Sequence, residues 1–260
     1  MSNLHKLFYK DYYNGVSFTL NQQDGRFSVS ATGSPIDMVE RSIGVPLQPD
    51  LLTDIDGYQC LDFEVQYPGL VTGVGIQHCA RADGEFKLGM HFDYTYGLPV
   101  IYGSSVKGVL KSYFKECYIG DKDVDCLIAD IFENQSYENN DKAKQSKYWN
   151  AFFDAIIIEA NSMNRIIDED IIAPHGDYAE ANTFVIPNQL VNPVPIKFLK
   201  ISSGVKLRFR FKLSPIMREG NVIMGVDEIL QNFIEILETF GIGAKTNVGY
   251  GQLKYIPKHD

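Results

Sequence analysis

The sequence predicts an α+β protein in which helices cover one face of a mainly antiparallel sheet. Two segments alternate apolar and polar residues with a period of two, as strands with one solvated face do. Two other segments repeat apolar residues at helical spacing. Along the chain these elements come in the order strand, helix, strands, helix, strand, which suits the split-βαβ folds.

The first strand is expected over residues 61–67, where apolar side chains alternate with Asp62, Glu64 and Gln66. A glycine-punctuated loop then leads to a helix at about 104–119, with Ser104 as its N-cap. The apolar residues of this helix share one face, and these are Val106, Val109, Leu110, Tyr113 and Cys117. Three lysines at every fourth position line another side of it.

Residues 120–147 end in a polar run with few apolar anchors, so we expect a polar insertion at about 120–150 within a single domain spanning 1–260. A buried strand is expected at 152–159, and loops with short strands at 166–178 and 183–199. The clearest strand is 205–213, where every second residue is Lys or Arg. The last helix, 226–240, ends at Gly241, and a short strand at 252–256 follows.

Composition limits the class of protein. The 260 residues carry 24 Lys and Arg against 33 Asp and Glu, a formal net charge of −9. No apolar run approaches the ~20 residues that span a bilayer, and no secretory signal is visible. The four cysteines form no CxxC pair. We therefore expect a soluble cytoplasmic protein without metal or cofactor, and any nucleic-acid contact must use a local patch because the net charge is acidic.

The tail from Gly241 to Gly251 is rich in glycine and contains Lys245. A P-loop requires glycine directly before Lys-Thr, and Ala244 stands there instead. A Rossmann loop leaves a strand and opens a helix, whereas this one leaves a helix and enters a strand. Two interpretations remain open, namely a helix end running into a glycine-kinked strand and a backbone-lined cradle for phosphate or RNA.

A second motif runs from Gly97 to Gly108 and places a helix start after a tight turn. The first turn of a helix exposes unpaired N–H groups and the positive end of the helix dipole, which together favour an anion. An ordinary capped helix with solvated lysines explains this motif equally well.

Taken together, the two motifs resemble the RAMP superfamily, the RNA-binding proteins that build CRISPR effector complexes. That superfamily has a Gly-Ser-Ser-x-Lys-Gly helix start, here 103–108, and a glycine-rich loop after its last helix, here 241–251. Within it, the chain is similar to the family of the sixth-numbered subunit of type III-B (Cmr) complexes. The features shared with that family are the 241–251 ending, the loop from His78 to His91, residues 174–178 and residues 192–196. Tyr102 stands where the superfamily usually has proline, and residues 1–56 resemble nothing known.

The resemblance implies a modified ferredoxin-like, RNA-recognition-motif sheet with insertions (the RAMP fold). It implies a non-catalytic subunit near the 3′ end of the guide RNA (crRNA), with complementary target RNA and other Cmr subunits as partners and with no membrane. Cleavage of target RNA belongs to a different subunit of such complexes.

Residues in the two motifs are the main candidates for binding RNA. They are Gly103, Ser104, Ser105, Lys107, Lys111, Gly241, Gly243, Lys245, Thr246, Asn247, Gly249, Tyr250 and Gly251. A second group comprises His78, His91, Arg208 and Arg210, although a basic strand face is more often simply solvated. The alternatives are a RAMP endoribonuclease that uses His78, His91 or His175 to process guide-RNA precursors, and a backbone subunit of another type III complex.

Overall fold

The structure is a computed structural model of the whole chain. It describes residues 3–23, 27–29, 34–47, 57–73, 86, 89–120, 122–136, 144–145, 149–172 and 195–257. The sequence predictions for residues 174–194, for His78 and for His175 lie outside these ranges.

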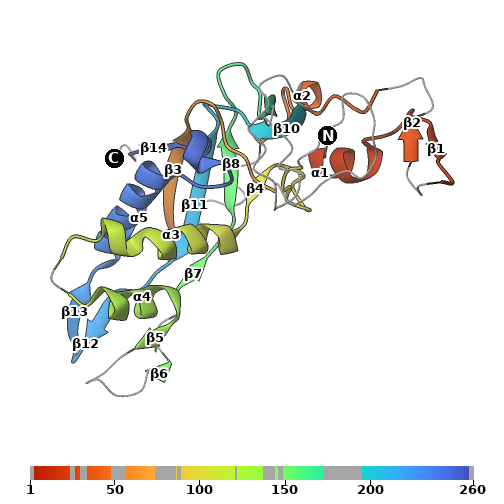
Figure 1. Ribbon diagram of the computed structural model, residues 1–260. Coiled ribbons are helices and arrows are strands. Elements are labelled where there is room, and N and C mark those ends of the chain that lie inside the picture. Colours follow the sequence, from red (N-terminus) through yellow and green to blue (C-terminus); the bar gives the residue numbers. More distant parts are fainter. Residues whose placement is uncertain are drawn as a thin grey trace, which may run out of the picture.

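A six-stranded antiparallel sheet forms the centre of the molecule (Figure 1). Its strands follow the order β14 (Leu253–Ile256), β3 (Gln59–Val65), β11 (Lys206–Lys212), β8 (Ala155–Glu159) and β4 (Val100–Ile101). The sixth strand, β7 (Ala151–Phe152), pairs with the end of β11.

The connections make two interleaved split-βαβ units. Strands β3 and β8 are parallel with β11 between them, and α3 (Gly103–Cys117) lies between them in the chain. Strands β11 and β14 are parallel with β3 between them, and α5 (Val226–Phe240) lies between those two in the chain. This arrangement is the ferredoxin-like fold that the sequence predicts. The bounds of α5 are those expected, and those of α3 differ by one or two residues.

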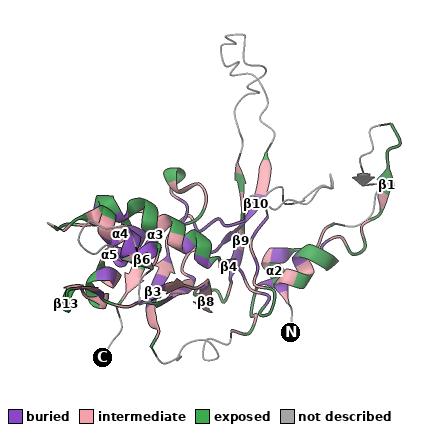
Figure 2. Cartoon of the chain, turned by 90° about the horizontal axis from the view of Figure 1, so that it is seen from below, coloured by how far each residue is buried: buried purple, intermediate pink, exposed green. Residues whose placement is uncertain are grey.

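Side-chain alternation in the two central strands separates a buried face from a solvated one. In β11 the residues Leu207, Phe209 and Phe211 are fully buried, while the lysines and arginines between them are not. Phe63 of β3 meets Phe209 edge to face, with ring centroids 5.3 Å apart. Helices α3 and α5 cover this apolar face, and Figure 2 shows the buried residues gathered between the helices and the sheet.

A third helix, α4 (Val124–Phe132), lies in the segment that the sequence analysis treats as a polar insertion. Asp123 caps its N-terminus by accepting hydrogen bonds from the amides of Asp125 and Cys126. Phe132 is fully buried and packs against Phe114 of α3 and Phe233 of α5. This helix is not identified within the segment from the sequence, because the long polar run that follows conceals its apolar face.

In the part of the chain that the structure describes, four small two-stranded sheets and three short helical segments surround this core. The sheets are β1 (Phe18–Leu20) with β2 (Phe27–Val29), β5 (Gln135–Ser136) with β6 (Lys144–Gln145), β9 (Ile167–Ile172) with β10 (Ile196–Ile201), and β12 (Ile216–Arg218) with β13 (Asn221–Met224). The segments are α1 (Leu4–Lys6), which runs into a π-helix (Leu7–Asp11), α2 (Met38–Arg41) and the 3₁₀-helix η3 (Thr246–Val248). None of the helices in the described ranges is long and apolar enough to cross a membrane.

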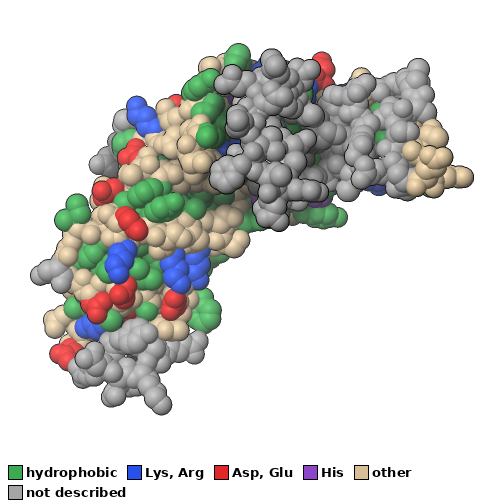
Figure 3. All heavy atoms as spheres, viewed as in Figure 1, with side chains coloured by type: hydrophobic (Ala, Val, Ile, Leu, Met, Phe, Trp, Pro, Cys, Tyr) green, Lys and Arg blue, Asp and Glu red, His purple; other side chains and the backbone are tan. Residues whose placement is uncertain are grey.

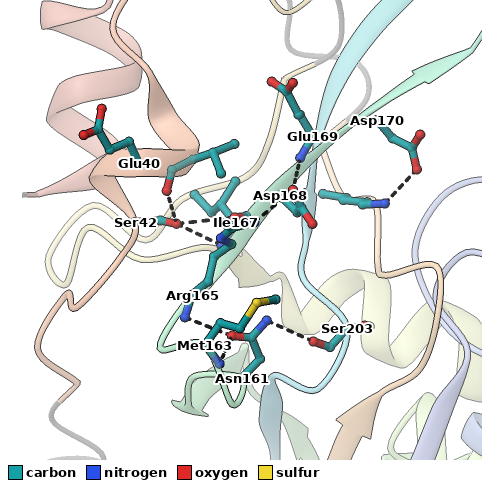
Figure 4. A network of polar contacts seen from close by, with 12 residues as sticks. Glu40, Ser42, Asn161, Met163, Arg165, Ile167, Asp168, Glu169, Asp170 and Ser203 are labelled. Carbon is teal, nitrogen blue, oxygen red and sulfur yellow. Dashed lines mark hydrogen bonds and ion pairs between the residues drawn. The ribbon is translucent and has the colours of Figure 1, made fainter.

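The N-terminal segments are packed onto the rest of the chain. Leu4, Phe8 and Tyr12 are buried, and the Phe8 ring lies 5.4 Å from that of Phe92. Figure 4 shows Ser42, just after α2, at the start of β9: its hydroxyl donates to Val39 O at 2.8 Å and accepts from the amide of Ile167 at 3.2 Å. Several described residues of the segment 1–56, for which the sequence suggests no role, thus contribute part of the core.

Replacing Phe132 tests whether α4 belongs to the core. Phe132→Ala should lower the free energy of unfolding by about 3–5 kcal/mol, because it leaves a cavity among three aromatic rings. Urea denaturation followed by circular dichroism measures this change. Ile119→Ala is the control, since Ile119 is 90% exposed and its loss should cost no more than about 0.5 kcal/mol. Equal effects of the two substitutions would contradict the packing of α4.

Candidate functional site

The two glycine motifs meet at one open groove of about 560 Å³. Helix α3 contributes one wall, and the start of the glycine-rich loop contributes another. The lining residues are Thr72, Gly73, His91, Ile101, Ser105, Gly108, Val109, Ile242, Gly243 and Ala244. Segments that are about 135 residues apart in the sequence therefore border the same space.

The glycine-rich loop closes on itself and on the segment that follows β3. The amide of Ile242 donates to Gly251 O at 3.0 Å, and the amide of Gly251 donates to Gly69 O at 2.8 Å. The amide of Ala244 donates to Val71 O at 2.8 Å. Gly243 has φ +102°, and a Cβ there would lie 2.5 Å from Val71 O, so only glycine fits this approach.

Within the described part of the chain, the hydrogen bonds that close the glycine-rich loop leave four of its backbone N–H groups without an acceptor. Lys245 adopts the left-handed conformation (φ +63°), and η3 follows it. The amides of Gly243, Lys245, Thr246 and Asn247 donate no hydrogen bond within the described part of the chain. Successive unpaired amides next to a lysine form a concavity suited to an anion. The amides of Gly241, Gly249 and Gly251 donate to Leu237 O, Thr246 O and Gly69 O, so they are not available for this purpose.

The start of α3 differs from the anion cradle that the sequence predicts. The amide of Gly103 donates to Asp154 Oδ1 at 2.7 Å, and the amide of Ser105 donates to Tyr102 O at 2.8 Å. A carboxylate at this position satisfies the helix end and complements its dipole. Ser104 and Ser105 are exposed, and the contribution of Ser105 to the groove comes from its position on α3.

None of the three candidate lysines, Lys107, Lys111 and Lys245, is among the described residues that line the groove. Lys107 Nζ lies 5.9 Å from the centroid of the Phe152 ring, and Lys111 Nζ pairs with Glu133 Oε1 at 2.7 Å. At 100° per residue, the groove face of α3 carries positions 105, 108 and 109, and positions 107 and 111 fall on another side. Figure 3 shows lysines and acidic residues interspersed over the helical face, where the charges are paired.

Tyr250 is buried, so it offers no ring for stacking on a base. Its hydroxyl donates to Asp170 Oδ2 at 2.8 Å, and its ring meets that of Phe198 edge to face. Burial and the neighbouring Asp170 carboxylate raise the pKa of Tyr250. Its role in this structure is to fasten the end of the glycine-rich loop to β9.

Among the histidines of the second candidate group, His91 lines the groove. Its ring stacks on that of Tyr102, with centroids 4.4 Å apart, and its Nδ1 lies 3.2 Å from the Thr72 hydroxyl. Burial lowers the pKa of His91, which favours the neutral imidazole at physiological pH.

Arg208 and Arg210 lie on the solvated face of the sheet, away from the groove lining. Arg208 forms a bidentate ion pair with Asp62, with distances of 2.7 and 2.6 Å, and Arg210 packs over the Phe153 ring. The same face carries the pair of Lys206 and Glu159 at 2.8 Å. Carboxylates thus offset much of the basic charge of β11.

The candidates drawn from the sequence leave out Thr72, Gly73, Tyr102 and Gly108. The first three reach the site through tertiary packing, which the local sequence does not reveal. Gly108 carries a visible signal, because it falls one turn after Ser104 on the same helix.

A ferredoxin-like sheet whose first helix and terminal glycine-rich loop border one groove defines an α+β class of protein with split-βαβ topology. A family model described as RAMP superfamily matches residues 62–254, and the chain belongs to that superfamily. No protein among curated sequences matches the chain.

Three solved structures illustrate the similarity. A chain of the type III-B Cmr-beta complex bound to cognate target RNA, determined by cryo-EM, is 21% identical with a TM-score of 0.53; the match covers 77% of this chain and 60% of that one. This likeness shows a shared fold, and the present chain spans about 60% of that relative. Cmr6 from Pyrococcus furiosus is 20% identical (TM-score 0.38, 76% and 98% covered), and a type IV-B CRISPR complex chain is 14% identical (TM-score 0.41, 76% and 89% covered).

The hydrogen bond from the Tyr250 hydroxyl to Asp170 of β9, which we call the clamp, predicts that the stability of the fold depends on pH. Partial burial acts to raise the pKa of Asp170, but hydrogen bonds from Lys200 and Tyr250 outweigh it and hold that pKa below its usual value. A lowered carboxyl pKa stabilises the fold above the unfolded value of about 3.9, and this stabilisation is lost as the pH falls through the folded value.

Asp170→Asn should therefore be less stable than the unchanged protein at pH 7, and the difference should shrink below about pH 4. Urea denaturation at a series of pH values measures both quantities. Tyr250→Phe removes one of the three donors to the Asp170 carboxylate and should reduce the pH-dependent difference only in part. A difference that stays constant from pH 7 to acid would contradict the clamp.

Proposed function

We propose that this chain is a non-catalytic, RNA-binding subunit of a type III-B CRISPR effector complex. In this proposal it takes the place of the sixth-numbered subunit, near the 3′ end of the guide RNA and in contact with neighbouring backbone subunits. The observation that carries the proposal is the convergence of α3 and the glycine-rich loop on one groove. Membership of the RAMP superfamily supports it, as does the fold shared with a chain of the Cmr-beta complex, which is bound to cognate target RNA.

The chemistry of the groove suits a sugar–phosphate backbone of variable sequence. Gly243, whose amide donates no hydrogen bond in the described part of the chain, lines the groove, and the unpaired amides of residues 245–247 follow it in the same loop. Such donors recognise phosphate oxygens and not base edges. Lys245 adds one positive charge to this loop. A guide RNA differs from one complex to the next only in its bases, so contacts of this kind accept every guide.

Gly108 gives independent support for a close approach by a ligand. It is exposed in the interior of α3, and a Cβ added there would meet nothing within 4 Å. Glycine in a helix interior costs about 0.5–1 kcal/mol relative to alanine. Since packing within the described residues gives no reason for this cost, we attribute it to the RNA backbone that enters the groove.

Removing the charge of Lys245 tests the phosphate contact. Lys245→Ala should weaken binding of two unrelated single-stranded RNAs by about tenfold, because a charge-assisted hydrogen bond contributes about 1.5 kcal/mol or more. The slope of log K against log salt should fall by about 0.7. Fluorescence anisotropy at several salt concentrations measures both effects. Lys111→Ala is the control and should leave both unchanged, since Lys111 pairs with Glu133 outside the groove.

A larger side chain in the groove should weaken RNA binding without lowering the stability of the fold. Gly108→Leu should unfold at the same or a higher urea concentration than the unchanged protein, because leucine is a better helix former, and it should bind RNA less tightly. Lys111→Leu places the same side chain on an exposed position of α3 that lies on another side of the helix from the groove. If both leucine variants bind RNA like the unchanged protein, the groove is not the binding site.

An endoribonuclease is the second candidate, favoured by the position of His91 in the groove. Acid–base cleavage of RNA generally needs two groups that exchange protons. Of the groove-lining residues that the structure describes, only His91 has a side chain that can serve as a general acid or base. We therefore expect labelled RNA to remain intact during prolonged incubation with the chain, and cleavage that disappears in His91→Ala would overturn the non-catalytic part of the proposal.

A further inference from the structure

An aromatic surface beside the groove has no role in the proposed contacts with phosphate. We propose that it binds unpaired RNA bases by stacking, where the RNA strand leaves the groove at the His91 side. This inference rests on the proposed function and extends it to a second surface of the same chain. We call this surface the aromatic strip, and its residues are His5, Tyr9, His91, Tyr94 and Tyr102.

The strip is continuous from an exposed tip to the groove wall. The ring of His5 lies 5.1 Å from that of Tyr94 and 4.6 Å from that of Tyr9. The Tyr9 hydroxyl donates to Met90 O at 3.3 Å, directly before His91. Tyr102 then stacks on His91, and His91 itself lines the groove. Proximity of Tyr9 to Tyr102 is also evident in the pKa of Tyr9, which burial and then Tyr102 raise.

The exposure of these rings is unusual for large aromatic side chains. Tyr94 is 81% exposed, Tyr9 44% and Tyr102 39%. Large apolar rings gathered at the surface next to a site generally mark an interaction surface. Tyrosine and histidine combine a flat face for stacking with a polar edge that tolerates water, which suits a nucleobase.

Hydrogen bonds and one buried aromatic contact fix the backbone that carries the strip. The amide of Leu4 donates to Gly97 O at 2.9 Å, which joins α1 to the loop that carries Tyr94. Phe8 is buried against Phe92. Asp93 accepts hydrogen bonds from the amides of Thr95 and Tyr96 and thereby fixes the turn. The backbone of these segments therefore loses little conformational entropy when a ligand binds.

The charges near the strip favour RNA as its occupant. The helical segment over residues 4–11 carries Lys6, Lys10 and one carboxylate, Asp11, which pairs with Lys6 at 2.7 Å. Such a segment attracts a polyanion while the rings accept bases. Stacking does not discriminate among the four bases, and so it serves a guide of variable sequence as the main-chain donors do. The N-terminal residues thus acquire a role that their sequence alone does not suggest.

The test compares two RNA probes of about 12 nucleotides, one oligouridine and one abasic oligomer with the same sugar–phosphate chain. The variants are Tyr94→Ala, Tyr9→Ala and the matched Tyr94→Phe and Tyr9→Phe. Trp149→Ala is the control for an exposed aromatic ring elsewhere, since Trp149 is 63% exposed and lies beside β7. Tyr94 is so exposed that its replacement does not threaten folding.

We expect the alanine variants to bind oligouridine about fivefold or more weakly, since stacking on one base contributes about 1–3 kcal/mol. They should bind the abasic oligomer like the unchanged protein, and the phenylalanine variants should retain oligouridine binding. Unchanged affinity of the alanine variants for oligouridine, or an equal loss for both probes, would overturn the stacking inference while leaving the groove assignment intact. Failure of the unchanged protein to bind either probe would overturn both proposals.

Discussion

The hydrogen bonds of residues 69–71 to two other parts of the chain hold the site together. On one side Leu70 exchanges backbone hydrogen bonds with Ile201 of β10, at 3.0 and 2.7 Å. On the other side Gly69 O and Val71 O accept the amides of Gly251 and Ala244 from the glycine-rich loop. The loop therefore has one available path from α5 to β14. The groove and the unpaired amides exist because this path is fixed.

Sequence periodicity is sufficient to predict the central fold but insufficient to predict the site. The helix at Val226–Phe240 and the strand at Lys206–Lys212 follow from apolar spacing, because their buried faces are long and regular. Helix α4 is not predicted in this way, because it has only nine residues and the polar run that follows it dominates the composition of the whole segment. The positions of Lys107 and Lys111 are predictable in principle from helical phase, which separates them from Ser105 and Gly108. The Asp154 cap and the N-terminal contacts are tertiary, and no local pattern encodes them.

A protein with a negative net charge that binds RNA must attract the RNA phosphates without a basic surface. The chain has a net charge of −9, and Arg208 and Lys206 on the solvated sheet face are paired with carboxylates. Main-chain amides resolve this conflict, since they supply partial positive charge at fixed positions and add no net charge. Affinity from such donors depends weakly on salt, whereas affinity from many lysines falls steeply. A subunit of this kind would gain specificity from position and neighbours, and it would avoid indiscriminate binding of nucleic acid.

In the two proposals, the groove and the aromatic strip contact the phosphate and the flat face of the base, which every nucleotide offers whatever the sequence. Amides and Lys245 are suited to the phosphate, and the rings of Tyr9, Tyr94 and Tyr102 are suited to the face of any base. Neither surface, in the residues that the structure describes, displays the bidentate side chains that read base edges. In the proposed function this division leaves the pairing edges of the guide unoccupied. A guide RNA must present those edges to its target, and a protein that grips only phosphates and base faces does not interfere with pairing.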